Sequence, residues 1–163
     1  MRRGLALLIA HIPLLSGMMA FAETPTANHA IAIIIPAHST SPGLTREKLA
    51  LIYKRKILYW DNDTKIQPVN LPISHALRSS FSQLLLGQSP EDMESFWNDM
   101  YFHGILPPYV LGSEEAVIRF IAATPGSIGY VDYCSIDPRV TAVLVLSASN
   151  RLESTPPDIE CHR

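Results

Sequence analysis

The stretch Ala30–Pro36, AIAIIIP, is a continuous apolar run with the length of one strand. An apolar run without polar alternation indicates a strand that is buried on both faces. The segment His38–Gly43 that follows is rich in turn-forming residues, and Thr45 then opens a helix whose apolar residues Leu49 and Ile52 share one face. A buried strand, a loop and a helix in this order form the first unit of an α/β fold.

The same signals predict the remaining elements, because each helix has a capping residue before it and a glycine or proline beyond it. Helices are expected over Ser74–Gly87 with Ser74 as the cap, over Ser89–Gly104, and from Ser113 to Pro125. Strands are expected over Lys65–Leu71, around Tyr109–Leu111, over Ser127–Val131 and over Val140–Leu146. Alternating strands and helices predict an α/β fold with a mixed, mostly parallel sheet flanked by helices.

Composition excludes one class of partner. The chain has 163 residues, with 13 Lys and Arg against 15 Asp and Glu, and a formal net charge of −2. That length is typical of one globular domain. Binding to a nucleic-acid backbone needs a concentration of Lys and Arg that this chain lacks, so no nucleic-acid partner is expected.

The amino terminus has the layout of a secretory signal peptide. Arg2 and Arg3 precede the apolar run Leu5–Ile12, and the small-residue site Ala20–Ala22 follows. The apolar run is interrupted before it reaches the roughly 20 residues of a membrane span. We therefore expect a periplasmic or secreted protein whose mature form has no membrane span, with an uncleaved signal anchor as the alternative. The expected organisation is a signal peptide over 1–22, a flexible leader over 23–29, an α/β domain over 30–146 and a C-terminal tail over 147–163.

The chain has two cysteines, Cys134 and Cys161. Export to an oxidising compartment makes them candidates for one disulfide that would hold the C-terminal tail. Two unpaired thiols are the other interpretation. The histidines lack the paired spacing of metal ligands, so neither a metal nor another cofactor is expected.

No catalytic motif is visible. The nucleophile elbow, the phosphate loop, the dinucleotide fingerprint and the zinc-protease motif are all absent, so an enzyme is not expected, and a hydrolase would need residues brought together from distant parts of the chain. What remains is a group of hydroxyls with one guanidinium, which suits a small oxyanion. The group consists of Ser39, Thr40, Ser74, Arg78, Ser79 and Ser80. In the competing interpretation Ser74 only caps its helix and Arg78 is a solvated surface residue.

Several stretches between Ile31 and Asp132 carry a family pattern. Residues Thr124–Val131 read TPGSIGYV, and residues Ile52–Trp60 read IYKRKILYW. Shorter matches are Arg78 with Phe81, Phe96–Trp97, Phe102 with Gly104, and Pro107–Pro108. These stretches resemble the phosphate-type periplasmic substrate-binding proteins of ABC transporters and their short single-lobe relatives. The first two are similar to the family's Pro-Gly-Ala-Ile-Gly-Tyr-Val and Ile-Phe-x-Gly-Lys-x-x-x-Trp patterns.

The resemblance implies a single lobe of the type II periplasmic-binding-protein fold. It also implies an exported, non-catalytic solute-binding protein for a small oxyanion such as phosphate, with an ABC permease or another envelope protein as partner. The family's Ser-Gly-Thr phosphate motif has no Gly-Thr counterpart in Pro72–Arg78, and residues 23–163 leave no room for the family's second lobe. The alternative is a cell-envelope protein-interaction module that kept the fold without a ligand.

Overall fold

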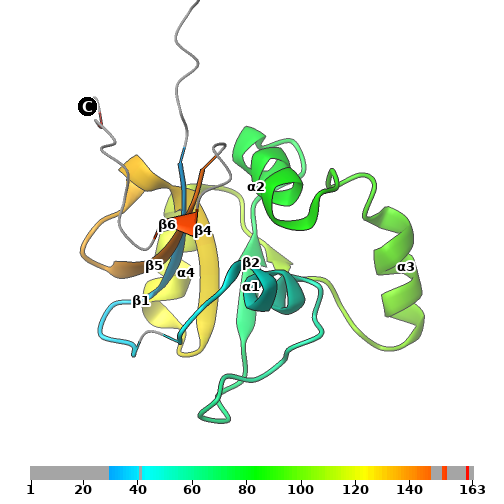
Figure 1. Cartoon of the computed structure of the whole chain (residues 1–163), viewed down its shortest axis with the longest axis horizontal. Helices are drawn as coiled ribbons and strands as arrows, with labels where there is room; N and C mark the ends of the chain where they lie inside the picture. Colours follow the sequence, from blue (N-terminus) through cyan, green and yellow to red (C-terminus); the bar gives the residue numbers. More distant parts are fainter. Residues whose placement is uncertain (1–29, 41, 148–151, 154–160, 162–163) are drawn as a thin grey trace, which may run out of the picture.

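A six-stranded mixed sheet runs through the molecule in the order β3-β2-β4-β1-β5-β6 (Figure 1). The strands are β1 (Ile31–Pro36), β2 (Gln67–Asn70), β3 (Tyr109–Val110), β4 (Ser127–Asp132), β5 (Val140–Leu146) and β6 (Leu152–Glu153). The structure is a computed structural model that describes residues 30–40, 42–147, 152–153 and 161. The expected signal peptide and leader, residues 1–29, lie outside this part. The predicted α/β fold with a mixed sheet is confirmed.

Strand β1 lies in the middle of the sheet and runs antiparallel to both neighbours, β4 and β5. Parallel pairing is confined to β2 with β3 and β2 with β4, so the parallel share is smaller than the sequence indicated. The side chains of β1 from Ile31 to Ile35 are all buried. This matches the unbroken apolar run, because β1 has a neighbour along each edge and a helix layer over each face.

The described part contains four α-helices, which are α1 (Arg46–Tyr53), α2 (Ala76–Leu86), α3 (Glu94–Phe102) and α4 (Glu114–Ala123). Of these, α3 lies to one side of the sheet (Figure 1). Thr45 and Ser113 cap α1 and α4 as predicted, each accepting a backbone N–H three residues on. Gly87 ends α2 in the left-handed conformation, also as predicted.

Two helix starts differ from the prediction. The cap of α2 is His75 and not Ser74, because the His75 imidazole Nδ1 accepts the Leu77 N–H at 3.3 Å. Ser89 caps a turn that precedes α3: its hydroxyl accepts the Asp92 N–H, and the Asp92 carboxylate accepts the Ser89 N–H, both at 3.1 Å. The sequence predicted Ser89 as the cap of the helix itself, but the regular helix begins only at Glu94, after this capped turn.

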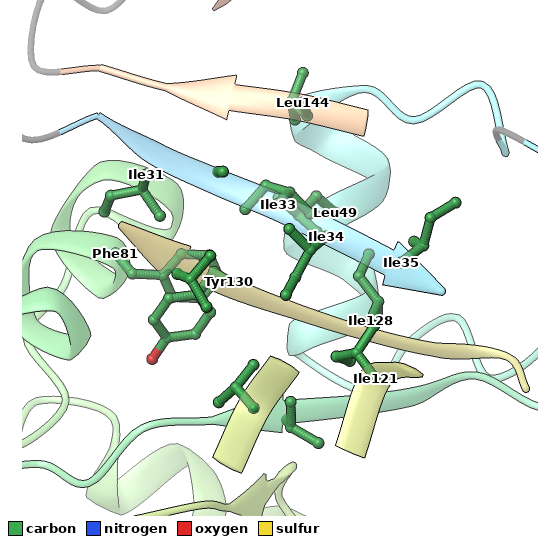
Figure 2. Packing of buried hydrophobic residues seen from close by; sticks show 14 of the residues in the cluster. Ile31, Ile33, Ile34, Ile35, Leu49, Phe81, Ile121, Ile128, Tyr130 and Leu144 are labelled. Carbon is green, nitrogen blue, oxygen red and sulfur yellow. The ribbon is translucent and has the colours of Figure 1, made fainter. Parts of the chain in front are cut away.

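The two faces of β4 show which helices cover the sheet. The Tyr130 ring stacks on Phe81 of α2 (Figure 2), with the ring centroids 3.8 Å apart. The Tyr53 ring of α1 lies 6.1 Å from the Tyr130 ring. The next residue back, Gly129, faces Val117 of α4. Since successive strand residues point to opposite faces, α1 and α2 cover one face of the sheet and α4 covers the other.

The region expected to be a tail contains two ordered features. Leu152–Glu153 forms strand β6, which pairs antiparallel with β5. Cys161 is joined to Cys134 by a disulfide, with the two Cα atoms 5.4 Å apart. The chain beyond β5 is thus attached to the sheet edge and to the turn after β4.

Replacing Gly129 by alanine should destabilise the fold. A Cβ at this position would lie 2.8 Å from Val117 Cγ1 and 3.0 Å from Val69 Cγ2, both in branched side chains that cannot swing away. We expect urea denaturation of Gly129→Ala to give a free energy of unfolding about 1 to 3 kcal/mol below that of the parent. Gly112→Ala is the control, because a Cβ there meets nothing within 4 Å and the change should stay within about 0.5 kcal/mol. Equal losses in the two variants would contradict this account of α4 packing.

Removing the disulfide should also lower stability. The two cysteines are 27 residues apart, and closing a loop of that size restricts the unfolded chain by about 3.5 kcal/mol in the chain-entropy model. The double variant Cys134→Ala, Cys161→Ala should therefore unfold at a lower urea concentration, and reduction of the parent protein should reproduce the shift. An unchanged midpoint in both experiments would show that the bond does not constrain the unfolded chain.

Candidate functional site

The predicted hydroxyl and arginine group is divided in the structure between the two opposite ends of the strands of the sheet. Ile31 at the start of β1 pairs with Asp132 at the end of β4. The loop after β1, with Ser39 and Thr40, therefore lies where β4 begins. Strand β2 runs parallel to β4, so the amino end of α2 that follows it lies where β4 ends. The loop after β1 and the start of α2 therefore do not form one site, as the sequence suggested, because β1 and β2 point in opposite directions.

The Ser39 and Thr40 edge has a hollow of about 690 Å³. Its described lining includes Trp60 and Asp61 but no cationic residue. Asp61 forms an ion pair with Lys48 at 3.2 Å, and the Trp60 indole N–H donates to the Gly126 carbonyl at 3.0 Å. A hollow whose charged lining residue is a carboxylate does not suit an oxyanion.

The other edge contains a buried polar group at the carboxyl ends of β2 and β4. The Tyr130 hydroxyl donates to Asn70 Oδ1 at 3.4 Å and accepts the Leu71 N–H at 3.2 Å. Tyr130 and Asn70 are 1% and 3% exposed. The Tyr53 hydroxyl, on the same side, donates to the Val69 carbonyl at 3.0 Å. These bonds satisfy polar groups that would otherwise be costly to bury, and they hold the end of β2 in a defined position.

Arg78 lies half-buried beside this polar group. Burial raises the pKa of the Tyr130 phenol, and the positive charge of the Arg78 guanidinium opposes that rise. Burial likewise raises the pKa of Tyr53 well above 10.0. Arg78 forms no ion pair with an acidic residue in the described part of the chain. Its partial burial and its place beside Tyr130 make Arg78 a candidate for the charged group of a ligand site at this edge.

The amino end of α2 offers few free amides. The Leu77 N–H is taken by the His75 imidazole, and the N–H groups of Arg78 and Ser79 reach the His75 carbonyl. In the described structure, this leaves Ala76 as the residue of the first turn whose N–H has no acceptor. A helix start that is largely satisfied internally binds an anion less well than one with several open amides.

The three predicted serines of this edge differ in position. Ser74 is exposed in the turn that leads into α2, next to the free Ala76 amide. Ser79 and Ser80 are exposed on the body of the helix, away from the buried stripe of Leu77 and Phe81. Ser74 can thus contribute a hydroxyl at the end of β2, whereas Ser79 and Ser80 only face solvent.

Sequence reasoning missed Asn70 and Tyr130. Tyr130 occurs inside an apolar strand run, and Asn70 is the last residue of a strand, so neither stood out as a ligand-binding residue. A signal was nevertheless present, because a polar residue at the carboxyl end of a buried strand is where α/β sheets place ligand contacts.

The described residues show neither a metal-binding cluster nor a membrane-spanning helix. No cluster of three or more His, Cys, Asp or Glu residues there could hold a metal ion. None of the described helices has the length and apolar character needed to cross a membrane.

The family model of the PBP superfamily domain matches residues 15–155, most of the chain. The chain belongs to the PBP superfamily. It is 28% identical over 128 residues to the phosphate-binding protein PstS of Bacillus subtilis, an alignment that covers 72% of this chain. The chain spans only 38% of the length of that curated relative.

Two solved structures agree with this membership. An ABC-type phosphate transport receptor from Vibrio cholerae superimposes with a TM-score of 0.58 at 23% identity, over 71% of this chain and 46% of the receptor. PstS from Borrelia burgdorferi superimposes with a TM-score of 0.52 at 26% identity, over 66% of this chain and 42% of that protein. The PBP-superfamily fold of the chain thus corresponds to less than half of either structure.

Stability should fall as the pH rises above about 10. The folded-state pKa values of Tyr53 and Tyr130 are raised because burial excludes the phenolate, whereas both groups ionise near 10.0 in the unfolded chain. Above that pH the unfolded state binds fewer protons and is favoured, while below it these tyrosines leave stability unchanged. Urea midpoints measured between about pH 9 and about pH 11 test this.

Tyr130→Phe should weaken the pH dependence, and the exposed Tyr101→Phe should retain it. Ultraviolet absorbance of tyrosinate gives an independent check. If Tyr53 and Tyr130 ionise while the protein is still folded, the two phenols are more accessible than the structure indicates.

Proposed function

We propose that this chain is an exported solute-binding lobe that binds a small oxyanion such as phosphate at the carboxyl ends of β2 and β4. The observation that carries the proposal is the half-buried Arg78 guanidinium, which faces no acidic partner in the described residues and lies beside the Tyr130 and Asn70 pair. Ligands of α/β sheets bind at this edge. The printed name of the Bacillus subtilis relative adds support, since that protein is phosphate-binding.

The groups at this edge suit a single small anion. Arg78 would supply charge and paired donors, as guanidinium groups do for phosphate. The Ala76 N–H, the Ser74 hydroxyl and the side-chain amide of Asn70 would supply neutral hydrogen bonds. Two carboxylates near the end of β4 are occupied with backbone amides: Glu114 accepts the Asp132 N–H at 2.7 Å, and Asp132 accepts the Cys134 N–H at 2.9 Å.

The site requires a partner surface for tight binding. Small-molecule sites normally bury most of the ligand, but this edge of the sheet is open on the side of the exposed Ser74. We propose that an ABC permease or another envelope protein covers the anion, so the protein acts by binding and transfer and not by catalysis. The expected signal peptide over residues 1–22 places this activity in the periplasm or outside the cell.

Calorimetric titration of the whole chain with inorganic phosphate tests the proposal. The Arg78→Ala variant should bind phosphate about 10 to 100 times more weakly, because a hydrogen bond to a charged group contributes about 1.5–3 kcal/mol. Arg119→Ala is the matched control: Arg119 is an exposed arginine of α4 whose partner is Glu115. Phosphate binding that is absent from the parent, or that survives unchanged in Arg78→Ala, would reject the site.

A further inference from the structure

A groove of about 590 Å³ follows the first half of β2 and the edge strand β3. Its walls are largely apolar and come from the α1–β2 connection and from the segment that leads into β3. The large apolar wall residues that are exposed are Leu58, Leu106, Tyr109 and Val110. Leu106, Tyr109 and Val110 are each more than 60% exposed. Exposed apolar side chains gathered around a concave surface are typical of a binding site.

Two cations, Arg55 and Lys65, lie among these apolar walls, and no acidic residue lines the groove in the described structure. Neither cation forms an ion pair with a described residue. The Arg55 side chain donates one hydrogen bond, from Nη1 to the Ile66 carbonyl at 3.3 Å. Its Nε is buried without an acceptor. A guanidinium has five N–H donors, and the described structure shows a protein acceptor for one of those of Arg55.

The backbone of Arg55 ends helix α1. Its φ is 56°, in the left-handed region that is common just beyond a helix. The Lys56 N–H donates to the Leu51 carbonyl at 2.8 Å and the Arg55 N–H to the Ile52 carbonyl at 2.9 Å, which fixes the position from which the Arg55 side chain leaves the backbone. Burial lowers the pKa of the Arg55 guanidinium, and the neighbouring Tyr109 phenol partly opposes that shift. The helix end thus holds a partly desolvated guanidinium at the wall of the groove.

We propose that this groove binds a small amphiphilic carboxylate. Its carboxylate would accept hydrogen bonds from Arg55 and Lys65, and its hydrocarbon body would lie against Leu106 and Tyr109. The apolar walls favour such a ligand over inorganic phosphate, which has no apolar part to bury. The volume is that of a small-molecule site. The groove shares no lining residue with the oxyanion site at Arg78, so the two sites can be tested separately.

Isothermal titration of the whole chain with octanoate, in parallel with the neutral octanamide, tests this inference. The parent protein should bind octanoate at least tenfold more tightly than octanamide. Arg55→Gln and Lys65→Gln should each reduce octanoate affinity several-fold or more, while Lys54→Gln, the neighbouring cation outside the groove, should retain it. Absence of octanoate binding to the parent, or equal binding of octanoate and octanamide, would overturn the proposal.

The Arg55→Gly variant separates a loss of octanoate binding from a loss of folding. Glycine adopts a positive φ without strain, so this variant should fold with an unfolding midpoint no lower than that of Arg55→Gln. It should lose octanoate binding at least tenfold and keep the phosphate affinity of the parent. Octanoate binding that persists in Arg55→Gly would overturn the assignment, and Arg78→Ala should leave octanoate affinity unchanged.

Discussion

Tyr130 lies in the centre of the molecule, with its ring in the core and its hydroxyl at the carboxyl end of β2. The ring stacks against Phe81 and so attaches α2 to the sheet. The hydroxyl binds the Leu71 amide and the Asn70 side chain, which fixes the chain where β2 leads toward α2. Because Arg78 is on the first turns of α2, its place beside the polar group depends on this one side chain. Core packing and the proposed oxyanion site are therefore not independent.

The antiparallel direction of β1 is the second constraint. It allows β1 to be buried between β4 and β5, but it sends the loop after β1 to the edge opposite α2. Ser39 and Thr40 consequently line a different hollow from Arg78. Because the strands of this sheet run in both directions, the loops that follow them lie at both ends of the strands. Residues of the same type that follow different strands therefore line different surfaces.

Arg78 and Arg55 illustrate how surroundings decide the chemistry of one residue type. Both guanidinium groups are half-buried, and neither faces a carboxylate among the described residues. Arg78 lies beside the Tyr130 and Tyr53 phenols, and such a polar setting suits a fully hydrated oxyanion that exchanges water for hydrogen bonds. The walls of the groove around Arg55 are largely apolar, so a ligand with a hydrocarbon part would gain binding free energy by burying that part there. The two proposed sites would thus give this member of the PBP superfamily two chemically distinct anionic ligands.

Much of the local structure was predictable from the sequence. The apolar run of β1, the caps Thr45 and Ser113, and Gly87 at the end of α2 each act through neighbouring residues, so their roles follow from residue type and spacing. The prediction failed by one residue at Ser74, where His75 competes as the cap. It also missed β6, because a two-residue strand depends on the partner strand and not on its own sequence.

The amino-acid sequence determined the α/β class, the buried central strand and the likeness to phosphate-binding proteins, since periodicity and local hydrogen bonding encode them directly. Only the tertiary structure decided which polar residues meet. The pairing of Tyr130 with Asn70 spans 60 residues, and the separation of Ser39 from Arg78 follows from strand direction. Both depend on how distant segments align in the sheet, which no local spacing specifies.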